Sequence, residues 1–253
     1  MAVTSGKGGV GKTFVSANLA AALARGGRKV LVLDADLGLA NLDVVLNLFP
    51  KITLHDVFTG KHVLQEAILP APGGFSVLLA GSGMVEYSRM TPEVREHLQR
   101  VIADVEPKFD HVLLDTGAGI SDVVLYTVSL AGSVLVVVTP EPTSMTDAYA
   151  TIKVLATQQQ RSEIRLVVNQ VGRVGEGRAI RGQLQLVIDR FVAPMMGRIG
   201  AAMRAAPKLE LLGEVPLDPA VREAVQKRRL LLELLPGSDA ARAVEAIAAR
   251  LAP

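Results

Sequence analysis

Residues Ser5–Thr13 read SGKGGVGKT, and from Gly6 to Thr13 they match the pattern G-x-x-x-x-G-K-T. This pattern is typical of a loop that cradles phosphate groups. Glycines have no Cβ, so the backbone N–H groups of such a loop turn inward and, with the N-terminus of the following helix, bind an anion. The pattern predicts that Lys12 reaches the β- and γ-phosphates and that the Thr13 hydroxyl binds Mg²⁺.

The sequence on both sides of this loop agrees with that prediction. Ala2–Thr4 is a short apolar run that indicates the end of a strand, and Phe14–Arg25 carries apolar residues at helical spacing. The order strand, loop, helix disfavours the alternative, a flexible glycine turn that matches the pattern by chance. We expect phosphate contacts from the residues along the loop, with Phe14 using its backbone N–H alone: Gly8, Gly9, Val10, Gly11, Lys12, Thr13 and Phe14.

A chain of 253 residues is long enough for one α/β domain or two small ones. Of the 253 residues 49% are hydrophobic and only 4% are aromatic, which is enough for one large aliphatic core. Apolar runs alternate with helical stretches, so we predict an α/β fold over residues 1–253: a single doubly wound, mostly parallel sheet flanked by helices. The net charge of +2 does not by itself indicate nucleic acid.

The absence of cysteine and the N-terminal sequence limit further which class of protein this can be. The sequence has no cysteine, which excludes disulfides, thiolate zinc sites and cysteine-held iron–sulfur clusters, including those of metallocluster carriers. The first residues lead straight into the predicted strand without a signal peptide, and no apolar run reaches the roughly 18 residues of a spanning helix. We therefore expect a cytoplasmic protein.

Aspartates at the ends of two predicted strands are candidates for binding magnesium and water. Arg28–Asp34 is a near-continuous apolar run that leads into Asp34 and Asp36, and Asp110–Asp115 is a second run that ends at Asp115. Open α/β sheets bind ligands at the carboxyl ends of their strands. An aspartate after a hydrophobic strand holds Mg²⁺ in proteins with a phosphate loop. Solvated turn residues are the alternative for the first pair.

The same patterns predict the remaining elements. Further strands are expected over Phe75–Ala80, Ser133–Thr139, Ile164–Asn169 and Leu209–Val215, and helices over Thr53–Phe58 and Arg178–Phe191. Helices are also expected to begin at caps, namely at Thr53 with Asp56 three residues later, at Thr91, at Thr143 or Ser144, and at Ser238. A mobile small-residue loop is expected over 116–119.

The phosphate loop contains a second lysine, Lys7. Taken alone, it would be an exposed charge on a tight turn. The pattern K-G-G-x-G-K-T, however, resembles the deviant Walker A sequence of the MinD/ParA ATPases, in which this extra lysine crosses to the nucleotide of the partner subunit. The resemblance implies an ATPase that forms a homodimer with ATP and Mg²⁺ at the interface.

Two further blocks extend the resemblance to the MinD/ParA ATPases. LDADLGLANLD over 33–43 is similar to their switch I, and DTGAGIS over 115–121 is similar to their switch II. The match implies that Asp36 positions or polarises the attacking water and that Asp34 helps to order the Mg²⁺ shell. The implied roles are therefore catalysis by Lys7, Lys12 and Asp36, metal binding by Thr13, Asp34 and Asp115, and adenine binding by Asn169 and the backbone at Pro216.

Several blocks resemble the flagellar-number branch of this family (FlhG/FleN). They are residues 33–60, with the stretch NLDVVLNLFPKITLHDVFTGK over 41–61, DTGAGIS over 115–121, the segment 139–155, and VREAVQKRRLLLELLP over 221–236. This branch implies a partner in the flagellar assembly system, either an FlhF-like GTPase or a transcription regulator. It also allows peripheral contact with the inner face of the cell membrane.

Other functions stay open at this point. A ParA-type partition ATPase or a MinD-type division-site ATPase would bind DNA or a membrane in an ATP-dependent way. The basic run Gln226–Arg229 motivates the DNA alternative, although a solvated helix end explains it better, so DNA is the less favoured partner. A binding module without hydrolysis is a third alternative, and Asp36 argues against it.

Overall fold

The computed structural model describes residues 1–37, 40–81, 90–196 and 206–251. In this part of the chain the strands form one eight-stranded sheet in the order β3-β4-β2-β5-β1-β6-β7-β8. The strands are β1 (Ala2–Ser5), β2 (Val30–Ala35), β3 (Ile68–Pro70), β4 (Ser76–Leu78), β5 (His111–Ala118), β6 (Val134–Val138), β7 (Glu163–Val171) and β8 (Lys208–Pro216).

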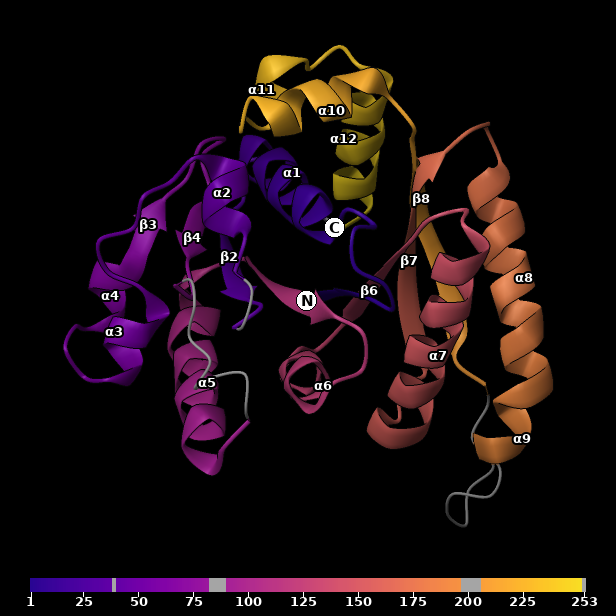
Figure 1. Cartoon of the computed structure of the whole chain (residues 1–253), viewed down its shortest axis with the longest axis horizontal. Coiled ribbons are helices and arrows are strands. Elements are labelled where there is room, and N and C mark those ends of the chain that lie inside the picture. Colours follow the sequence, from indigo (N-terminus) through magenta and orange to yellow (C-terminus); the bar gives the residue numbers. More distant parts are fainter. Residues whose placement is uncertain (38–39, 82–89, 197–205, 252–253) are drawn as a thin grey trace.

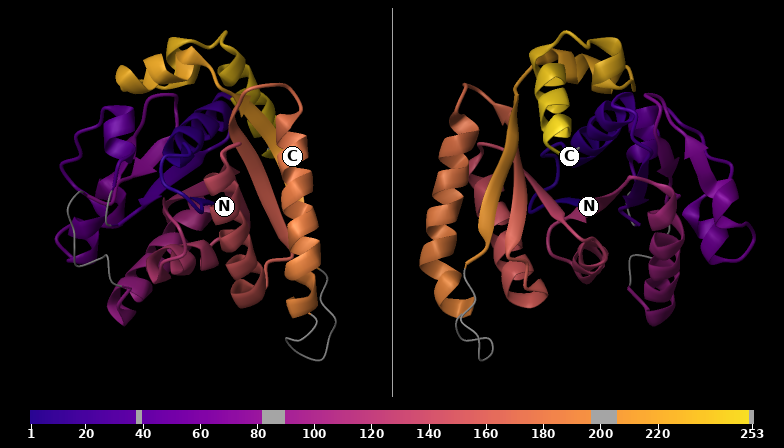
Figure 2. Two further views of the ribbon diagram at one scale, coloured as in Figure 1. Left: turned by 45° about the vertical axis from the view of Figure 1, so that its right-hand side comes forward. Right: turned by 180° about the vertical axis from the view of Figure 1, so that it is seen from behind.

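The helices flank this sheet. They are α1 (Lys12–Arg25), α2 (Leu42–Leu46), α3 (Leu54–Phe58), α4 (Leu64–Ala67), α5 (Pro92–Val105), α6 (Asp122–Ser129), α7 (Pro142–Gln159), α8 (Glu176–Phe191), α9 (Ala193–Met196), α10 (Pro219–Gln226), α11 (Leu231–Leu234) and α12 (Asp239–Leu251). Helices α1 and α12 lie on one face of the sheet, while α5, α6 and α7 lie on the other (Figures 1 and 2). The predicted single doubly wound α/β fold is thus confirmed.

Within the described residues, every strand pair is parallel except β3 with β4, which is antiparallel. The sequence did not predict β3, because it is only three residues long and ends at Pro70, which cannot donate a backbone hydrogen bond. A strand of three residues is too short to show an alternation of apolar and polar side chains. The predicted mostly parallel sheet is nevertheless correct.

The buried strands are apolar on both faces because helices cover both faces. Along β2, Leu31 and Leu33 belong to one hydrophobic cluster, while Val30 and Val32 belong to the cluster on the opposite face. This arrangement explains why the strand reads as a continuous apolar run instead of an alternating one.

The last helix, α12, packs on the core, as predicted. The backbone N–H of Ala241 donates to the Ser238 hydroxyl at 3.2 Å, so Ser238 caps the helix. Val244 and Ile247 of α12 are buried, and the helix packs against strand β8 and helix α1. Among the described residues no helix combines the length and apolar character that a bilayer crossing requires.

Besides Ser238, two further predicted caps are confirmed and one is wrong. The Thr53 N–H donates to the Asp56 carboxylate at 3.0 Å before α3, and the Thr91 hydroxyl accepts from the Val94 N–H at 3.4 Å at the start of α5. Ser144 does not cap α7. It lies inside the first turn, where its hydroxyl accepts from the Thr139 N–H at 3.0 Å.

Candidate functional site

The phosphate loop connects β1 to α1, as predicted. Gly9 and Gly11 have φ angles of +79° and +92°, a left-handed backbone that disfavours residues with a Cβ. Gly11 is the residue before α1, so the loop turns directly into the helix N-terminus. The helix begins at Lys12, two residues before the predicted start, because the lysine and Thr13 already form its first turn.

A cleft of about 820 Å³ opens above this loop. The loop side is formed by Gly8, Gly9, Gly11, Lys12, Thr13 and Phe14. The opposite side includes Asp36 after β2 and Thr116 and Gly117 from β5. A Cβ added to Gly8 or Gly9 would meet nothing within 4 Å, so the space over the loop is open. The volume is in the range of small-molecule and cofactor sites.

Asp115 lies at the floor of the site, beside α1. The Ser16 hydroxyl donates to its Oδ1 at 2.9 Å, and both residues are buried. Burial raises the pKa of Asp115 to about 6, and the hydroxyls of Thr13 and Ser16 and the Lys12 ammonium oppose that rise. Sequence reasoning missed Ser16, although a hydroxyl three residues after Thr13 falls on the same helix face and was therefore detectable.

The prediction that Asp115 ends its strand is wrong. β5 continues to Ala118, and it does so because β1 supplies a pairing partner, with Ser5 opposite Ala118. Thr116 and Gly117, expected in a mobile loop, are therefore strand residues. A Cβ on Gly117 would lie 3.4 Å from Asp36 Oδ1, which places the Asp36 carboxyl directly beside this glycine.

Lys12 is the cation of the site. Burial lowers the pKa of Lys12, while the carboxylates of Asp115 and Asp36 act in the opposite direction. A half-buried lysine that lies near two carboxylates and borders an open cleft is held ready for an anionic ligand. Phosphate is the ligand that this combination of lysine, glycine loop and helix N-terminus suits.

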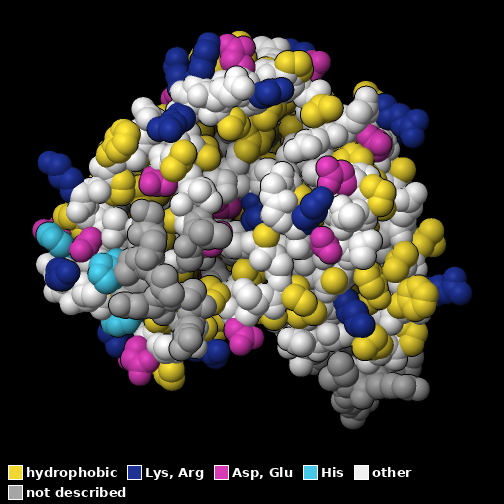
Figure 3. All heavy atoms as spheres, viewed as in Figure 1, with side chains coloured by type: hydrophobic (Ala, Val, Ile, Leu, Met, Phe, Trp, Pro, Cys, Tyr) yellow, Lys and Arg dark blue, Asp and Glu magenta, His cyan; other side chains and the backbone are white. Residues whose placement is uncertain are grey.

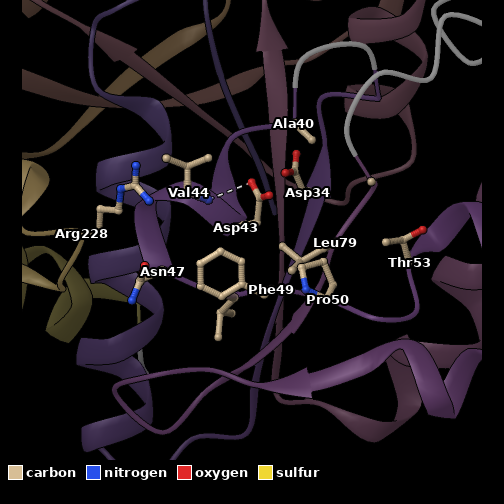
Figure 4. A pocket seen from close by; sticks show the side chains of 12 residues that line it. Asp34, Ala40, Asp43, Val44, Asn47, Phe49, Pro50, Thr53, Leu79 and Arg228 are labelled. Carbon is tan, nitrogen blue, oxygen red and sulfur yellow. Dashed lines mark hydrogen bonds between the residues drawn. The ribbon is translucent and has the colours of Figure 1, made fainter.

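Asp34 is next to Asp115 in the sheet. The two residues are register partners on β2 and β5. Burial, followed by the neighbouring Asp115 charge, raises the pKa of Asp34 well above its ordinary range. Its side chain lines a separate cavity of about 290 Å³ behind α2, together with Asp43, Phe49 and Arg228 (Figure 4).

Lys7 points away from the cleft and toward α7. Its Nζ lies 2.7 Å from Glu141 Oε2 and donates to the Thr143 hydroxyl at 3.0 Å. Side-chain exposure is 38% for Lys7 and 60% for Glu141, so the pair is open to solvent. The structure therefore brings Lys12, Thr13, Asp36 and Asp115 together and leaves Lys7 outside that group.

Asn169 contacts the phosphate loop from the side. It lies within β7, not at its end, and its Nδ2 donates to the Val10 carbonyl oxygen at 2.8 Å. Asn169 is buried, and neither Asn169 nor Pro216, the last residue of β8, borders the cleft. The predicted adenine contacts of these two residues stay predictions.

The basic run 226–229 begins at the end of α10. Lys227 forms an ion pair with Glu223 one turn earlier, at 2.7 Å. On the face shown in Figure 3, lysine and arginine side chains near α10–α12 share the surface with acidic ones. This mixture is typical of a solvated helix end, the interpretation that the sequence favoured.

Comparison with known proteins gives consistent results. Residues 1–252 match the model of the ParA family described as "NUBPL iron-transfer P-loop NTPase". The chain is 43% identical over 251 residues to the antiactivator FleN of Pseudomonas aeruginosa, covering 99% of this chain and 85% of that protein. It is 32% identical over 253 residues to the flagellum site-determining protein YlxH of Helicobacter pylori, covering 99% and 81%.

Solved structures of the same architecture include division-site ATPases. The cell division ATPase MinD of Pyrococcus furiosus superposes with a TM-score of 0.79 at 28% identity, covering 99% of this chain and 96% of that one. MinD of Pyrococcus horikoshii, solved with Mg-ADP, gives a TM-score of 0.78 at 28% identity, covering 99% and 94%.

Proposed function

The chain belongs to the ParA family of P-loop NTPases, in its FlhG/FleN branch, and from this membership we propose that it is an ATPase that acts as a dimerising switch in the control of flagellar number. The single observation that carries the proposal is that Lys12, Thr13 and Asp36 line one cleft above the phosphate loop and that Asp115 is buried directly beside Lys12 and Thr13. These residues come from three separate elements, so the cluster is a product of the fold and not of one local motif.

The residues present fit Mg²⁺ and a triphosphate. Thr13 and Asp115 offer the hard oxygen atoms that Mg²⁺ prefers, and Asp115 is already oriented by two hydroxyl groups. The open space beside Gly8 and Gly9 allows a phosphate to approach the loop backbone. Bound Mg²⁺ would neutralise charge on the phosphate oxygens. We propose that Thr13 and Asp115 hold it.

Hydrolysis needs little covalent chemistry from the protein. Lys12 stabilises charge on the transferred phosphoryl group, and the loop N–H groups fix its position. Asp36 lies on the opposite side of the cleft, beside Gly117, where a carboxylate orients the attacking water. Lys7 completes the charge stabilisation from the second subunit when two copies close over their nucleotides.

The partners follow from the relatives. The Pseudomonas relative is named an antiactivator, so we propose a transcription regulator as the partner, with an FlhF-like GTPase of the flagellar system as the alternative. A MinD relative of 27% identity forms a complex with MinC, so the fold supports partner binding. We place the protein in the cytoplasm, with peripheral contact to the inner face of the cell membrane.

Phosphate release from ATP by purified protein tests this function. We expect Lys12→Ala to lose nucleotide binding and turnover, and Asp36→Ala to bind ATP with turnover reduced at least about 100-fold. Lys108→Ala and Asp104→Ala, both exposed and distant from the cleft, are matched controls that should behave as wild type. Turnover in Asp36→Ala equal to that of the controls would remove the assignment of Asp36, and wild-type protein without ATPase activity would contradict the enzyme itself.

A further inference from the structure

The Asp34 carboxylate uses both of its oxygens within the protein. Oδ1 accepts from the Asp36 N–H at 3.2 Å, and Oδ2 accepts from the Leu42 N–H at 3.3 Å. The first bond is an Asx turn, in which an aspartate binds the backbone two residues later. The second reaches the first residue of α2. One buried side chain therefore connects the two ends of the segment that begins with Asp36.

Asp34 lies beside Asp115 in the sheet, but it borders a different space from Asp36. Asp36 borders the nucleotide cleft, while Asp34 borders the cavity behind α2. In Figure 4 the Asp34 side chain lies near Ala40, across that cavity from Arg228.

We propose that Asp34 is a positioning residue for hydrolysis, which acts by fixing the backbone of Asp36 and the start of α2, and that it is not a Mg²⁺ ligand. This inference rests on the proposed ATPase function and changes the role that the sequence indicated for Asp34. Both oxygens already accept a backbone hydrogen bond, and turning the carboxylate toward a metal would leave at least one buried N–H without an acceptor. The position of the Asp36 carboxyl beside Gly117 then depends on Asp34.

The test compares three aspartate-to-asparagine variants of the full chain. In Asp34→Asn the amide keeps one acceptor oxygen but presents an NH₂ group to the other N–H, so one backbone bond is lost. Asp115→Asn removes a proposed metal ligand. Asp110→Asn is the matched control, because Asp110 also accepts a backbone N–H, from Lys29 at 2.7 Å, but at the opposite end of β2.

We expect Asp34→Asn to lower kcat at least about tenfold while the Mg²⁺ concentration for half-maximal activity stays within about threefold of wild type. Asp115→Asn should raise that Mg²⁺ requirement strongly, and Asp110→Asn should change neither quantity. Unchanged kcat in Asp34→Asn, or a Mg²⁺ requirement raised as in Asp115→Asn, would overturn the inference. If Asp115→Asn leaves the Mg²⁺ requirement unchanged, the proposed metal site fails instead.

Amide hydrogen exchange gives a readout that does not depend on measuring turnover. In wild-type protein with ATP, the Asp36 and Leu42 amides should stay protected when Mg²⁺ replaces EDTA. A metal-ligand role predicts the opposite, because Asp34 would leave the Leu42 N–H and its exchange would accelerate on Mg²⁺ addition. In Asp34→Asn without nucleotide we expect exchange at one of these two amides at least about tenfold faster than in wild type or Asp110→Asn. Equal exchange in all three proteins would also overturn the inference.

Discussion

The Lys7 ammonium lies 2.7 Å from the Glu141 carboxylate at the start of α7, on the outer side of the phosphate loop. A lysine that serves the partner subunit must leave this ion pair and its bond to Thr143 before it crosses an interface. Since both partners are exposed, the pair is screened and weak, and breaking it costs on the order of 0.2–1 kcal/mol.

Glu141→Gln should therefore strengthen ATP-dependent self-association. Removal of the carboxylate eliminates a competitor for Lys7 in each of the two subunits, so the expected gain is about two- to thirtyfold in the dimerisation constant, measured by sedimentation in the Asp36→Ala background. Glu245→Gln is the control, because Glu245 forms a comparably exposed pair with Arg25 between α1 and α12. Equal dimerisation of the two variants would show that the Lys7–Glu141 pair does not compete with assembly.

Asn169→Ala should weaken ATP binding by about tenfold, as measured by titration with a fluorescent ATP analogue. The substitution leaves the buried Val10 carbonyl without its donor and loosens the loop that holds phosphate. Asn18→Ala is a suitable control, since Asn18 is equally buried and donates to the Phe14 carbonyl within α1. It should lower the free energy of unfolding with a smaller effect on affinity. The prediction fails if both variants bind ATP equally well.

Asp115 makes the stability of the nucleotide-free protein depend on pH. Its pKa is raised from 3.8 to about 6 on folding, so between these values the folded state binds more protons than the unfolded state. Stability contributed by this group therefore decreases as pH rises from about 4 to 6. Asp115→Asn should flatten that slope and, without Mg²⁺ or nucleotide, raise the free energy of unfolding at pH 7 by about 1–3 kcal/mol.

Urea denaturation at pH 5 and pH 7 measures this effect. The pKa of Asp34 is also raised, so Asp34 makes the free energy of unfolding depend on pH in the same direction in both proteins. The quantity to compare is therefore the difference in the free energy of unfolding between wild type and Asp115→Asn. The electrostatic account is wrong if Asp115→Asn is less stable than wild type at pH 7 and the difference does not change with pH.

Gly6→Ala should destabilise the protein by more than about 2 kcal/mol. A Cβ at Gly6 would lie 2.2 Å from the carbonyl carbon and oxygen of Asp147 in α7, and backbone atoms within a helix cannot move aside easily. Gly8→Ala is the matched substitution in the same loop, because its Cβ would meet nothing within 4 Å. Thermal unfolding of both variants without nucleotide checks the prediction, and equal melting temperatures would contradict it.

Local signals in the sequence were sufficient for much of the fold and the site. The glycine loop with Lys12 and Thr13, and the pairing of Thr53 with Asp56, depend on residues within a few positions of one another. Hydrophobic periodicity likewise predicted the buried strands. These features form from short-range sterics and hydrogen bonds, so the sequence alone indicates them.

The remaining features depend on contacts between distant segments. Lys7 meets Glu141 across 134 positions, and Asn169 meets Val10 across 159, so neither pairing has a local signature. The extension of β5 to Ala118 has the same origin, since the end of that strand is set by its pairing with β1. The role proposed above for Asp34 likewise depends on its contacts with the Asp36 and Leu42 N–H groups, which a linear motif does not specify.

The central claim is that ATP closes two copies of the chain over their nucleotides, with Lys7 of each serving the other. Its most direct test is the molar mass of Asp36→Ala, measured by size-exclusion chromatography with light scattering in Mg-ATP and in Mg-ADP. We predict twice the chain mass of 26.8 kDa with ATP and the single mass with ADP, and a single mass with either nucleotide when Lys7→Ala is added. A single mass for Asp36→Ala in saturating Mg-ATP at high protein concentration would contradict the claim.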